Sequence, residues 1–387
     1  MKFTVILAAV IAIAQAAPLI NNGGKAIADS YIVVLKNGNT ADSFKAKFDD
    51  IARRQNGRGR KPTIHRKYQK FNGFAATVNQ AALKELLASD EVEFIEQDAV
   101  VTIAGSQSSP PSWGLPRVSQ RTRNLAANYL FPDAAGEGVT AYVVDTGVYI
   151  EHNDLEGRAT WGANFIDGSD DTDENGHGTH VAGTIGGASY GVAKKVSLVG
   201  VKVLDAEGSG SISGVVGGMD WVAEHATPGK SVVNMSLGGG KSATIDAAAQ
   251  RLFDANIPLI VAAGNSATTN ACNGSPSGAA NTYTVAASDR NDRVASFTSY
   301  GSCVEIFAPG VGITSAWIGG ADATNTISGT SMATPHVVGV AALYLSTGSY
   351  PTAQSLFDKL TSTATPNKIT GSLKGSPNRL LFNGGGL

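Results

Sequence analysis

From about residue 139 onward, short apolar runs alternate with segments of helical periodicity, and this alternation limits the fold more than any other feature. Strands that are apolar along their whole length are covered on both faces, which is typical of a parallel sheet between two layers of helices. The sequence therefore predicts an α/β domain with a mostly parallel central sheet and helices on both faces. The expected strands are 139–145, 196–203, 231–237, 259–263 and 282–287, and the expected helices are 177–186, 211–225, 245–255 and 331–345.

A smaller unit precedes this domain. Residues 30–102 combine strand and helix patterns, so we expect a small α+β domain there. Within it, residues 53–61 (RRQNGRGRK) are too basic and glycine-rich to fold alone, and we expect an exposed loop. The pair Arg53-Arg54 in that stretch is compatible with a processing site or, more simply, with a solvated run of charge. The strand patterns lie at 31–35, 74–78 and 92–95, and the helical patterns at 43–51 and 80–88.

The first sixteen residues have the pattern of a secretory signal peptide. They contain one lysine, an apolar run from Phe3 to Ala14, and the ending Ala14-Gln15-Ala16. The run is too short for a membrane anchor, which needs about 20 apolar residues. We therefore expect a secreted, extracellular product.

The overall charge excludes some classes of partner. The formal net charge of −2 argues against a nucleic acid or an anionic membrane as the main partner, because both require a basic surface. Two cysteines are also too few for a disulfide-based scaffold.

Three reactive side chains lie where expected strands end or expected helices begin. Asp145 ends the apolar run in AYVVDTGV, His177 opens a helix in NGHGTHVAG, and Ser331 opens another in GTSMATPHV. An imidazole can accept and return a proton near neutral pH, and a serine at a helix start lies beside free backbone N–H groups. Ligands bind at the carboxyl ends of strands in such sheets. The pattern predicts nucleophilic catalysis at that edge.

Each of these residues also has a simpler interpretation. Asp145 could cap a turn, and Ser331 could be an ordinary helix N-cap. His177 and His180 could form a metal-binding pair, but metalloprotease helices place their histidines four residues apart with a glutamate between them. A G-x-S-x-G nucleophile turn is absent, and the order Asp, His, Ser differs from that of α/β-hydrolases.

A fourth segment, AAGN, ends another expected strand at Asn265. The amide of Asn265 could donate a hydrogen bond to a developing oxyanion, or the residue could simply form a turn after glycine.

The segments VVDTG, NGHGTHVAG, AAGN and GTSMATPHV occur in this order and together resemble the subtilase family, especially its proteinase K-like branch. The resemblance extends from about Trp113 to about Leu345. It implies a secreted serine endopeptidase in which Asp145, His177 and Ser331 form the catalytic triad. Asn265 would hold the oxyanion together with the backbone N–H of Ser331.

Residues 30–102 look like the inhibitory propeptide of the same family. The resemblance implies a signal peptide at 1–16, a propeptide at 17–104 and a mature peptidase domain at 105–387. The tail at 94–103 would lie in the cleft as a strand, with Ala104 or Gly105 beside Ser331 until the enzyme cuts that bond itself. The expected partners are protein or peptide substrates and the propeptide, and we expect a monomer.

Two further segments are similar to the edges of the family's substrate cleft, where an extended peptide pairs as an added strand. For the glycine-rich segment, a flexible turn is the alternative. Together with a pocket wall, these edges imply a preference for apolar or aromatic side chains before the cut. The edges are Gly208, Ser209 and Gly210, and Ser236, Leu237 and Gly238, and the wall includes Ala263 and Gly264.

The resemblance also implies structural calcium and a disulfide. In the proteinase K-like branch an aspartate ligates Ca²⁺ at the position of Glu305, and the acidic run 167–174 could form another site or a solvated loop. Cys272 and Cys303 match the paired cysteines of aqualysin-like members, with two separate buried thiols as the alternative.

Two other functional classes compete with a peptidase. One is a binding or inhibitor protein that keeps the scaffold without catalysis, although none of the four motifs is incomplete. The other is an esterase or lipase with the same catalytic chemistry, although no apolar lid is evident and the strand-like cleft edges favour peptides.

Overall fold

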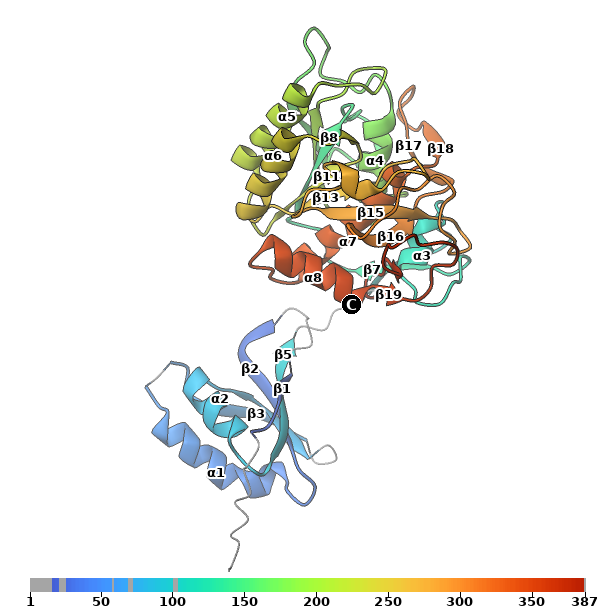
Figure 1. Cartoon of the computed structure of the whole chain (residues 1–387). Coiled ribbons are helices and arrows are strands. Elements are labelled where there is room, and N and C mark those ends of the chain that lie inside the picture. The colour runs from blue at the N-terminus through green and yellow to red at the C-terminus, as the bar shows by residue number, and fades with distance from the viewer. Residues whose placement is uncertain (1–15, 21–25, 58, 69–71, 100–103, 386–387) are drawn as a thin grey trace, which may run out of the picture. The chain divides into compact units, whose positions relative to one another are not determined.

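The computed structural model describes residues 16–20, 26–57, 59–68, 72–99 and 104–385, and the chain divides into two compact units, 1–101 and 102–387 (Figure 1). Nearly all of the predicted signal peptide and the end of the predicted propeptide tail, residues 100–103, lie outside the described residues. Among those described, no helix is both long enough and apolar enough to cross a membrane.

In the smaller unit, two helices accompany a five-stranded sheet of order β1-β5-β2-β4-β3. Neighbouring strands are antiparallel except β1 and β5. Phe44 and Phe48 of α1 pack on Phe74 of β4, with ring centroids 5.8 and 5.4 Å apart. The expected α+β unit is confirmed. Its elements are β1 (Leu19–Ile20), β2 (Ala26–Leu35), α1 (Ala41–Arg54), β3 (Thr63–Tyr68), β4 (Gly73–Thr77), α2 (Gln80–Leu87) and β5 (Val92–Ala99).

Helix α1 extends further than the sequence predicted. We expected Arg53 and Arg54 in an exposed loop, but they form the last turn of α1, where cations interact favourably with the helix dipole. Arg54 contacts Asp50 one turn earlier, and it also donates to Glu85 of α2 at 2.7 Å. These carboxylates offset the charges of the first two arginines of the run, and α1 continues through them to its C-cap at Gln55.

The larger unit is built on a nine-stranded sheet of order β19-β20-β16-β15-β13-β11-β8-β10-β9. All neighbouring strands are parallel except β19 and β20. The predicted parallel sheet is confirmed. Its strands are β8 (Thr140–Asp145), β9 (Ala159–Asn164), β10 (Ser197–Lys202), β11 (Ser231–Met235), β13 (Leu259–Ala262), β15 (Tyr283–Ser288), β16 (Val304–Pro309), β19 (Thr365–Pro366) and β20 (Arg379–Leu380).

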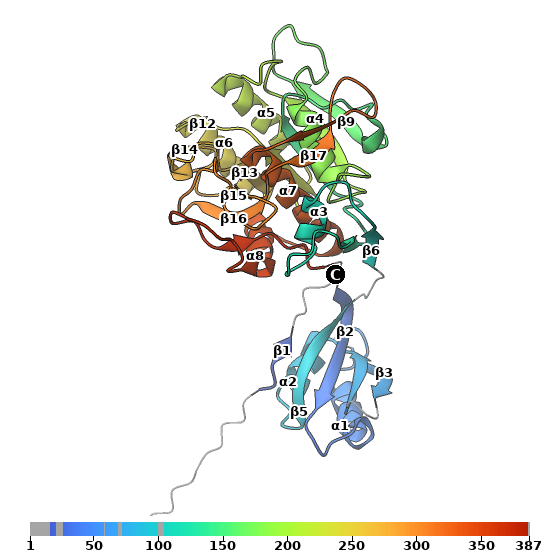
Figure 2. The ribbon, with the colours of Figure 1, turned by 90° about the vertical axis from the view of Figure 1, so that its right-hand side faces the viewer.

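Helices cover both faces of this sheet (Figure 2). Alternate residues of β8 show the division: Ala141 and Val143 face a core shared with α4 and α7, whereas Tyr142 and Val144 face a core shared with α5 and α6. The helices are α3 (Gly114–Val118), α4 (His177–Gly186), α5 (Ile212–His225), α6 (Ala243–Asp254), α7 (Thr330–Thr347) and α8 (Ala353–Thr363). Short ladders complete the unit: β6 (Ala104–Gln107) with β7 (Tyr129–Pro132), β12 (Gly239–Gly240) with β14 (Gly274–Ser275), and β17 (Ile313–Ala316) with β18 (Thr324–Ile327).

The ladder of β6 and β7 corrects one expectation. We expected Ala104 or Gly105 beside Ser331, but the antiparallel register places Ala104 opposite Pro132 and Gly105 opposite Phe131. A Cβ at position 105 would lie 2.6 Å from Cε2 of Phe131, so glycine permits this close approach. The cleavage that the resemblance implies here would require this ladder to open, so that the segment could bind as an extended strand.

A buried ion pair joins α3 to the turn after β15. Arg117 is only 1% exposed, and its Nε and Nη2 donate to the two carboxylate oxygens of Asp292 at 2.7 and 3.1 Å. The third nitrogen donates to the carbonyl of Gln120 at 2.6 Å. The carbonyl of Asp292 also accepts from the N–H of Thr370, so this pair connects three distant segments of the chain.

We expect Asp292→Ala to destabilise the protein by about 3–5 kcal/mol, because it leaves a buried guanidinium without its counterion. The matched control is Glu137→Ala, which removes an exposed partner of Lys195 and should cost less than about 1 kcal/mol. Denaturant unfolding of the two variants and the wild-type protein measures both values. Equal losses in the two variants would contradict the assignment of Arg117 and Asp292 as a stabilising buried pair.

Candidate active site

The reactive residues predicted from the sequence lie at the carboxyl edge of the sheet. Asp145 is the last residue of β8, His177 the first of α4, and Ser331 the second of α7. Asn265 follows β13 by three residues. Because neighbouring parallel strands end at the same edge, the fold gathers side chains that are far apart in the sequence.

Two glycines allow α4 to begin close to the end of β8. Gly176 has φ of 99°, a left-handed conformation that glycine adopts without strain. A Cβ on Gly178 would lie 2.0 Å from the carbonyl oxygen of Gly147. The small residues around His177 are therefore what brings its backbone within reach of Asp145.

Asp145 and His177 are in direct contact. Nδ1 of His177 lies 2.7 Å from Oδ1 of Asp145, which also accepts from the N–H of Thr146 at 2.8 Å. An ionised carboxylate can only accept, so Nδ1 carries the proton and Nε2 of the neutral imidazole is available as a base. The pair thus fixes both the orientation and the tautomer of His177.

Burial and charge act in opposite directions on this imidazole. Burial alone would lower the pKa of His177, but the charge and the hydrogen bond of Asp145, with the charge of Asp173, raise it above its ordinary value. Asp145 is fully buried, and its second oxygen has no hydrogen-bond partner among the described residues. A protonated imidazole is therefore the main counterion available to this carboxylate.

Ser331 lies beside Ser236, the residue that follows β11. Oγ of Ser331 donates to the carbonyl of Ser236 at 2.9 Å, and Oγ of Ser236 donates to the carbonyl of Ser331 at 2.8 Å. The hydroxyl of Ser331 is thus held at the cavity by a backbone acceptor, and a rotation about its χ1 angle changes its partner. Catalytic hydrogen bonds often form only when substrate is bound.

The amide of Asn265 is oriented by Thr330. Oδ1 of Asn265 accepts from both the N–H and the hydroxyl of Thr330, at 2.8 and 2.9 Å. Since a backbone N–H can only donate, the atom facing it must be the amide oxygen, and Nδ2 points elsewhere as a donor. The N–H of Ser331 lies in the first turn of α7 and has no acceptor within that helix. Two donors are therefore available beside Ser331.

A cavity of about 350 Å³ lies next to Ser331 and Asn265, with Ala263 and Gly264 in its wall as predicted. None of the side chains that line it is charged. Its other lining residues include Leu237, Ala262, Thr269, Ala271, Gly274 and Ser277. The cavity can accept a side chain that is apolar or uncharged.

A second cavity, of about 550 Å³, contains His177 and lies between the two predicted cleft edges. One edge is Gly208, Ser209 and Gly210, which are exposed, and the other is Ser236, Leu237 and Gly238. The loop with the glycines is ordered by Asp205, whose carboxylate accepts from the N–H groups of Glu207 and Ser209. The two cavities share the edge of Ser236, Leu237 and Gly238.

Comparisons with known proteins agree with this geometry. The subtilase family matches residues 136–379, and the peptidase inhibitor I9 family matches residues 30–104. A cuticle-degrading serine protease of Arthrobotrys oligospora is 46% identical over 388 residues, covering 94% of this chain and 93% of the relative. A cuticle-degrading protease of Metarhizium anisopliae is 43% identical over 377 residues, covering 96% and 94%. The crystal structure of a cold-adapted subtilisin-like serine proteinase is 49% identical with a TM-score of 0.67, covering 70% of this chain and 97% of that one.

The chain belongs to the subtilase family. It is a subtilisin-like serine endopeptidase of the proteinase K-like type, because its serine protease relatives match nearly its whole length. Its N-terminal unit is an I9-type inhibitor propeptide, which is consistent with synthesis as a zymogen.

This subtilase contains one disulfide. Cys272 and Cys303 are bonded, with their Cα atoms 5.5 Å apart and a sequence separation of 31. Cys272 lies in a short 3₁₀ helix (Ala271–Asn273) whose first residue lines the smaller cavity. The predicted pairing is confirmed, and it connects a wall of that cavity to the segment before β16.

The surroundings of Glu305 do not fit the calcium ligand that the resemblance suggested. Oε2 of Glu305 lies 3.7 Å from the guanidinium of Arg379, whereas a calcium ion requires six or more oxygen ligands. Burial raises the pKa of Glu305, although Arg379 lowers it in part. In the part of the chain that the structure describes, no group of three or more acidic, histidine or cysteine side chains could hold a metal. Calcium binding stays a prediction.

His177 and His180 do not form a pair of metal ligands. Nε2 of His180 donates to the carbonyl of Ile313 at 2.9 Å, and burial lowers the pKa of His180 to about 4. His177 faces Asp145 instead. The two imidazoles therefore have separate partners, and His180 is a buried core residue that is neutral near pH 7.

Sequence reasoning gave no role to two residues that shape this site. Thr330 precedes Ser331 in the motif GTSMATPHV. Its position next to the serine was the only feature of the sequence that could have indicated its role. Lys202 ends an otherwise apolar strand and is fully buried, with Nζ donating to the carbonyl of Thr146 at 2.8 Å. A lone cation in a buried strand is the signal that could have identified it.

We expect Asn265→Ala to lower kcat by roughly 10²–10³ with little change in KM, because the lost donor acts on charge that develops only in the transition state. This magnitude is the one known for the corresponding donor in subtilisin and is taken from there. Steady-state kinetics on a small peptide substrate measure it. A rise in KM at constant kcat would instead make Asn265 a residue that binds the ground state.

Proposed function

We propose that this subtilase is an exported endopeptidase in which Ser331 is the nucleophile, His177 the general base and Asp145 the residue that orients the imidazole. The observation that carries this proposal is the 2.7 Å contact of His177 with Asp145. His177 lines one cavity and Ser331 lines another, and the two cavities share the edge of Ser236, Leu237 and Gly238. Three groups with these chemistries meet at one edge of the sheet.

In this mechanism, Oγ of Ser331 forms a bond to the carbonyl carbon of the substrate while its proton passes to Nε2 of His177. The imidazolium then gives this proton to the nitrogen of the leaving amine as the C–N bond breaks. Water, activated by the same imidazole, releases the acyl group from Ser331. Asp145 keeps its charge throughout and stabilises the imidazolium.

The negative charge on the carbonyl oxygen would be held by Nδ2 of Asn265 and the N–H of Ser331. Thr330 supports this assignment because it binds the other atom of the amide and leaves Nδ2 free to donate. Before attack, the hydroxyl of Ser331 has to leave the carbonyl of Ser236 and turn to His177.

Substrates would bind as extended strands between the two cleft edges, mainly through backbone hydrogen bonds. The side chain before the cut would enter the cavity of about 350 Å³, whose uncharged lining supports a preference for apolar or aromatic residues. Relatives named as cuticle-degrading proteases support protein substrates.

Export and self-processing are part of the proposal. The signal-like pattern at 1–16 and the I9 match at 30–104 support a secreted precursor that is inhibited by its own propeptide. The net charge of −2 supports a partner other than nucleic acid or membrane, and we propose that the mature enzyme acts as a monomer.

The test is Ser331→Ala in the full-length precursor, expressed in a host without a helping protease. We expect no cleavage of peptides, no labelling by a fluorophosphonate and no maturation, because the triad acts as a unit. On wild-type enzyme, a peptide series should give kcat/KM values for phenylalanine or leucine before the cut at least tenfold above those for lysine or aspartate.

Maturation of the Ser331→Ala precursor at the wild-type rate would refute autoprocessing by this serine. Labelling of wild-type protein at a different residue would refute the proposed nucleophile. Hydrolysis of esters without any cleavage of peptides would favour the esterase interpretation.

A further inference from the structure

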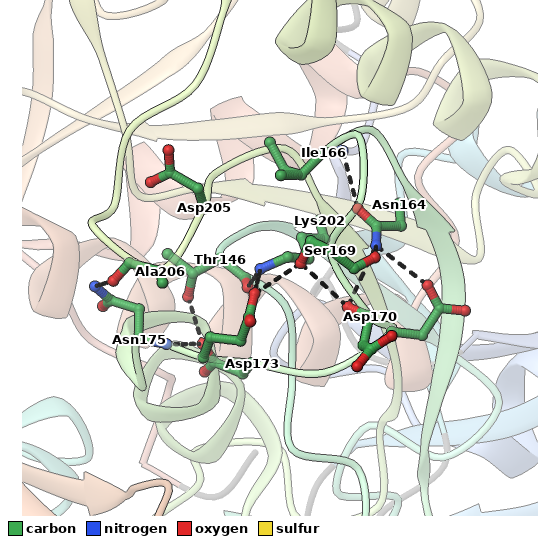
Figure 3. Close-up of polar contacts among 12 residues, drawn as sticks. Thr146, Asn164, Ile166, Ser169, Asp170, Asp173, Asn175, Lys202, Asp205 and Ala206 are labelled. Carbon is green, nitrogen blue, oxygen red and sulfur yellow. Dashed lines mark hydrogen bonds and ion pairs between the residues drawn. The ribbon is translucent and has the colours of Figure 1, made fainter.

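Asp173 is the one residue of the acidic run 167–174 that is buried, with 4% of its surface exposed. The sequence suggested a metal site or a solvated loop for this run, and neither describes Asp173. It precedes His177 by four residues and lies just before α4. Figure 3 shows it beside Thr146, the residue that follows Asp145.

The carboxylate of Asp173 accepts five hydrogen bonds. Oδ1 accepts from the hydroxyl of Thr146 at 2.8 Å and from the N–H groups of Asn175 and Gly176 at 3.1 and 2.9 Å. Oδ2 accepts from the N–H and the hydroxyl of Thr179 at 2.9 and 2.6 Å. Every partner is a donor, so both oxygens are required as acceptors.

These bonds join the two elements that carry the catalytic pair. Thr146 directly follows β8, whereas Gly176 is the N-cap of α4 and Thr179 lies in its first turn. The N-cap residue of α4 is Gly176, which has no side chain, so Asp173 supplies the acceptor that a capping side chain would normally give. The hydroxyl of Thr146 accepts in turn from the N–H of Gly178 at 2.9 Å.

We propose that Asp173 is a positioning residue: its buried carboxylate holds the start of α4 against the end of β8 and so sets the contact of His177 with Asp145. This inference rests on the proposed function, because it assumes that His177 is the general base. Asp173 itself does not touch the substrate.

The hydrogen bonds of Thr146 support this role of Asp173, because the N–H, the hydroxyl and the carbonyl of Thr146 each have a partner. Its N–H donates to Asp145, its hydroxyl donates to Asp173, and its carbonyl accepts from the ammonium of Lys202. Lys202 is fully buried, and its ammonium lies 3.5 Å from the carboxylate of Glu174, the neighbour of Asp173. A small displacement of α4 would therefore break several buried bonds, which makes the arrangement rigid.

The charges around His177 come from several elements. Asp145 belongs to β8, Lys202 to β10, and Asp173 and Glu174 to the acidic run. Glu207, on the glycine loop, lines the same cavity as His177. His180 of α4 is neutral near pH 7 because burial lowers its pKa to about 4. Among these groups, Asp145 and Asp173 stabilise the protonated imidazole, so loss of either charge lowers the pKa of His177.

The main test is Asp173→Asn in the full-length precursor, with Asp170→Asn as the matched control. Asp170 belongs to the same run and is exposed, so the control removes the same charge without removing buried acceptors. The asparagine amide places an NH₂ group against hydrogen-bond donors and so disturbs the start of α4. We expect kcat per active site to fall by at least about tenfold, because misplacing a catalytic group by about 1 Å can lower the rate by about 10². Titration with a fluorophosphonate counts the active sites, and KM should change little.

The pH profile separates positioning from a merely structural role. The acid limb of kcat/KM reports the pKa of the free general base. In Asp173→Asn we expect this limb to move to lower pH by roughly several tenths of a unit, which is the effect expected of one nearby charge. In Asp170→Asn the limb should move less.

If Asp173→Asn does not accumulate as mature enzyme, Thr179→Val carries the test. It removes the hydroxyl that donates to Asp173 and accepts from the N–H of Tyr149, and it keeps the charge of Asp173. We therefore expect a lower kcat with an unmoved acid limb. Kinetics and an acid limb equal to those of Asp170→Asn, or a normal kcat in Thr179→Val, would overturn the proposal. Full activity of His177→Ala would instead overturn the proposed function, which keeps the two failures distinguishable.

Discussion

The hydrogen bond of Asp145 with His177 is the interaction on which the rest of the site depends. A fully buried carboxylate is costly unless it is paired, and here its charge faces one imidazole and one backbone N–H. This cost is also what makes His177 a stronger base than a free histidine, because the imidazolium is the counterion of the carboxylate. The surrounding fold has to keep the two residues together at the edge of the sheet.

The sheet and two glycine-containing helix starts provide that constraint. β8 is packed between two cores, so the end of the strand cannot move without disturbing both helical layers. Helix α4 approaches β8 closely because Gly178 has no side chain, and α7 presents Ser331 beside the amide that Thr330 orients. Rigid elements hold the proposed catalytic groups, whereas an exposed loop, Gly208–Gly210, lines the cavity beside them.

Much of this could be predicted from the sequence, because it depends on local patterns. The apolar runs predicted the central strands, and small residues around His177 and Ser331 marked the two helix starts. Several contacts between distant segments could not be predicted: the pairing of Gly105 with Phe131, the partner Arg379 of Glu305, and the bond of Asp173 with Thr146 depend on the tertiary fold. The positions of the carboxylates in the run 167–174 do not indicate that Asp173 is buried while Asp170 is exposed.

The most direct test of this account is a titration of the His177 imidazole by NMR in ¹⁵N-histidine-labelled enzyme, with His177→Ala to assign the signal. His180 and His336 have pKa values near 4, which separates them from His177. We predict a pKa for His177 above the ordinary value of about 6.5, and a lower one in Asp145→Asn. A pKa at or below the ordinary value in the wild-type enzyme, unchanged in Asp145→Asn, would contradict the account.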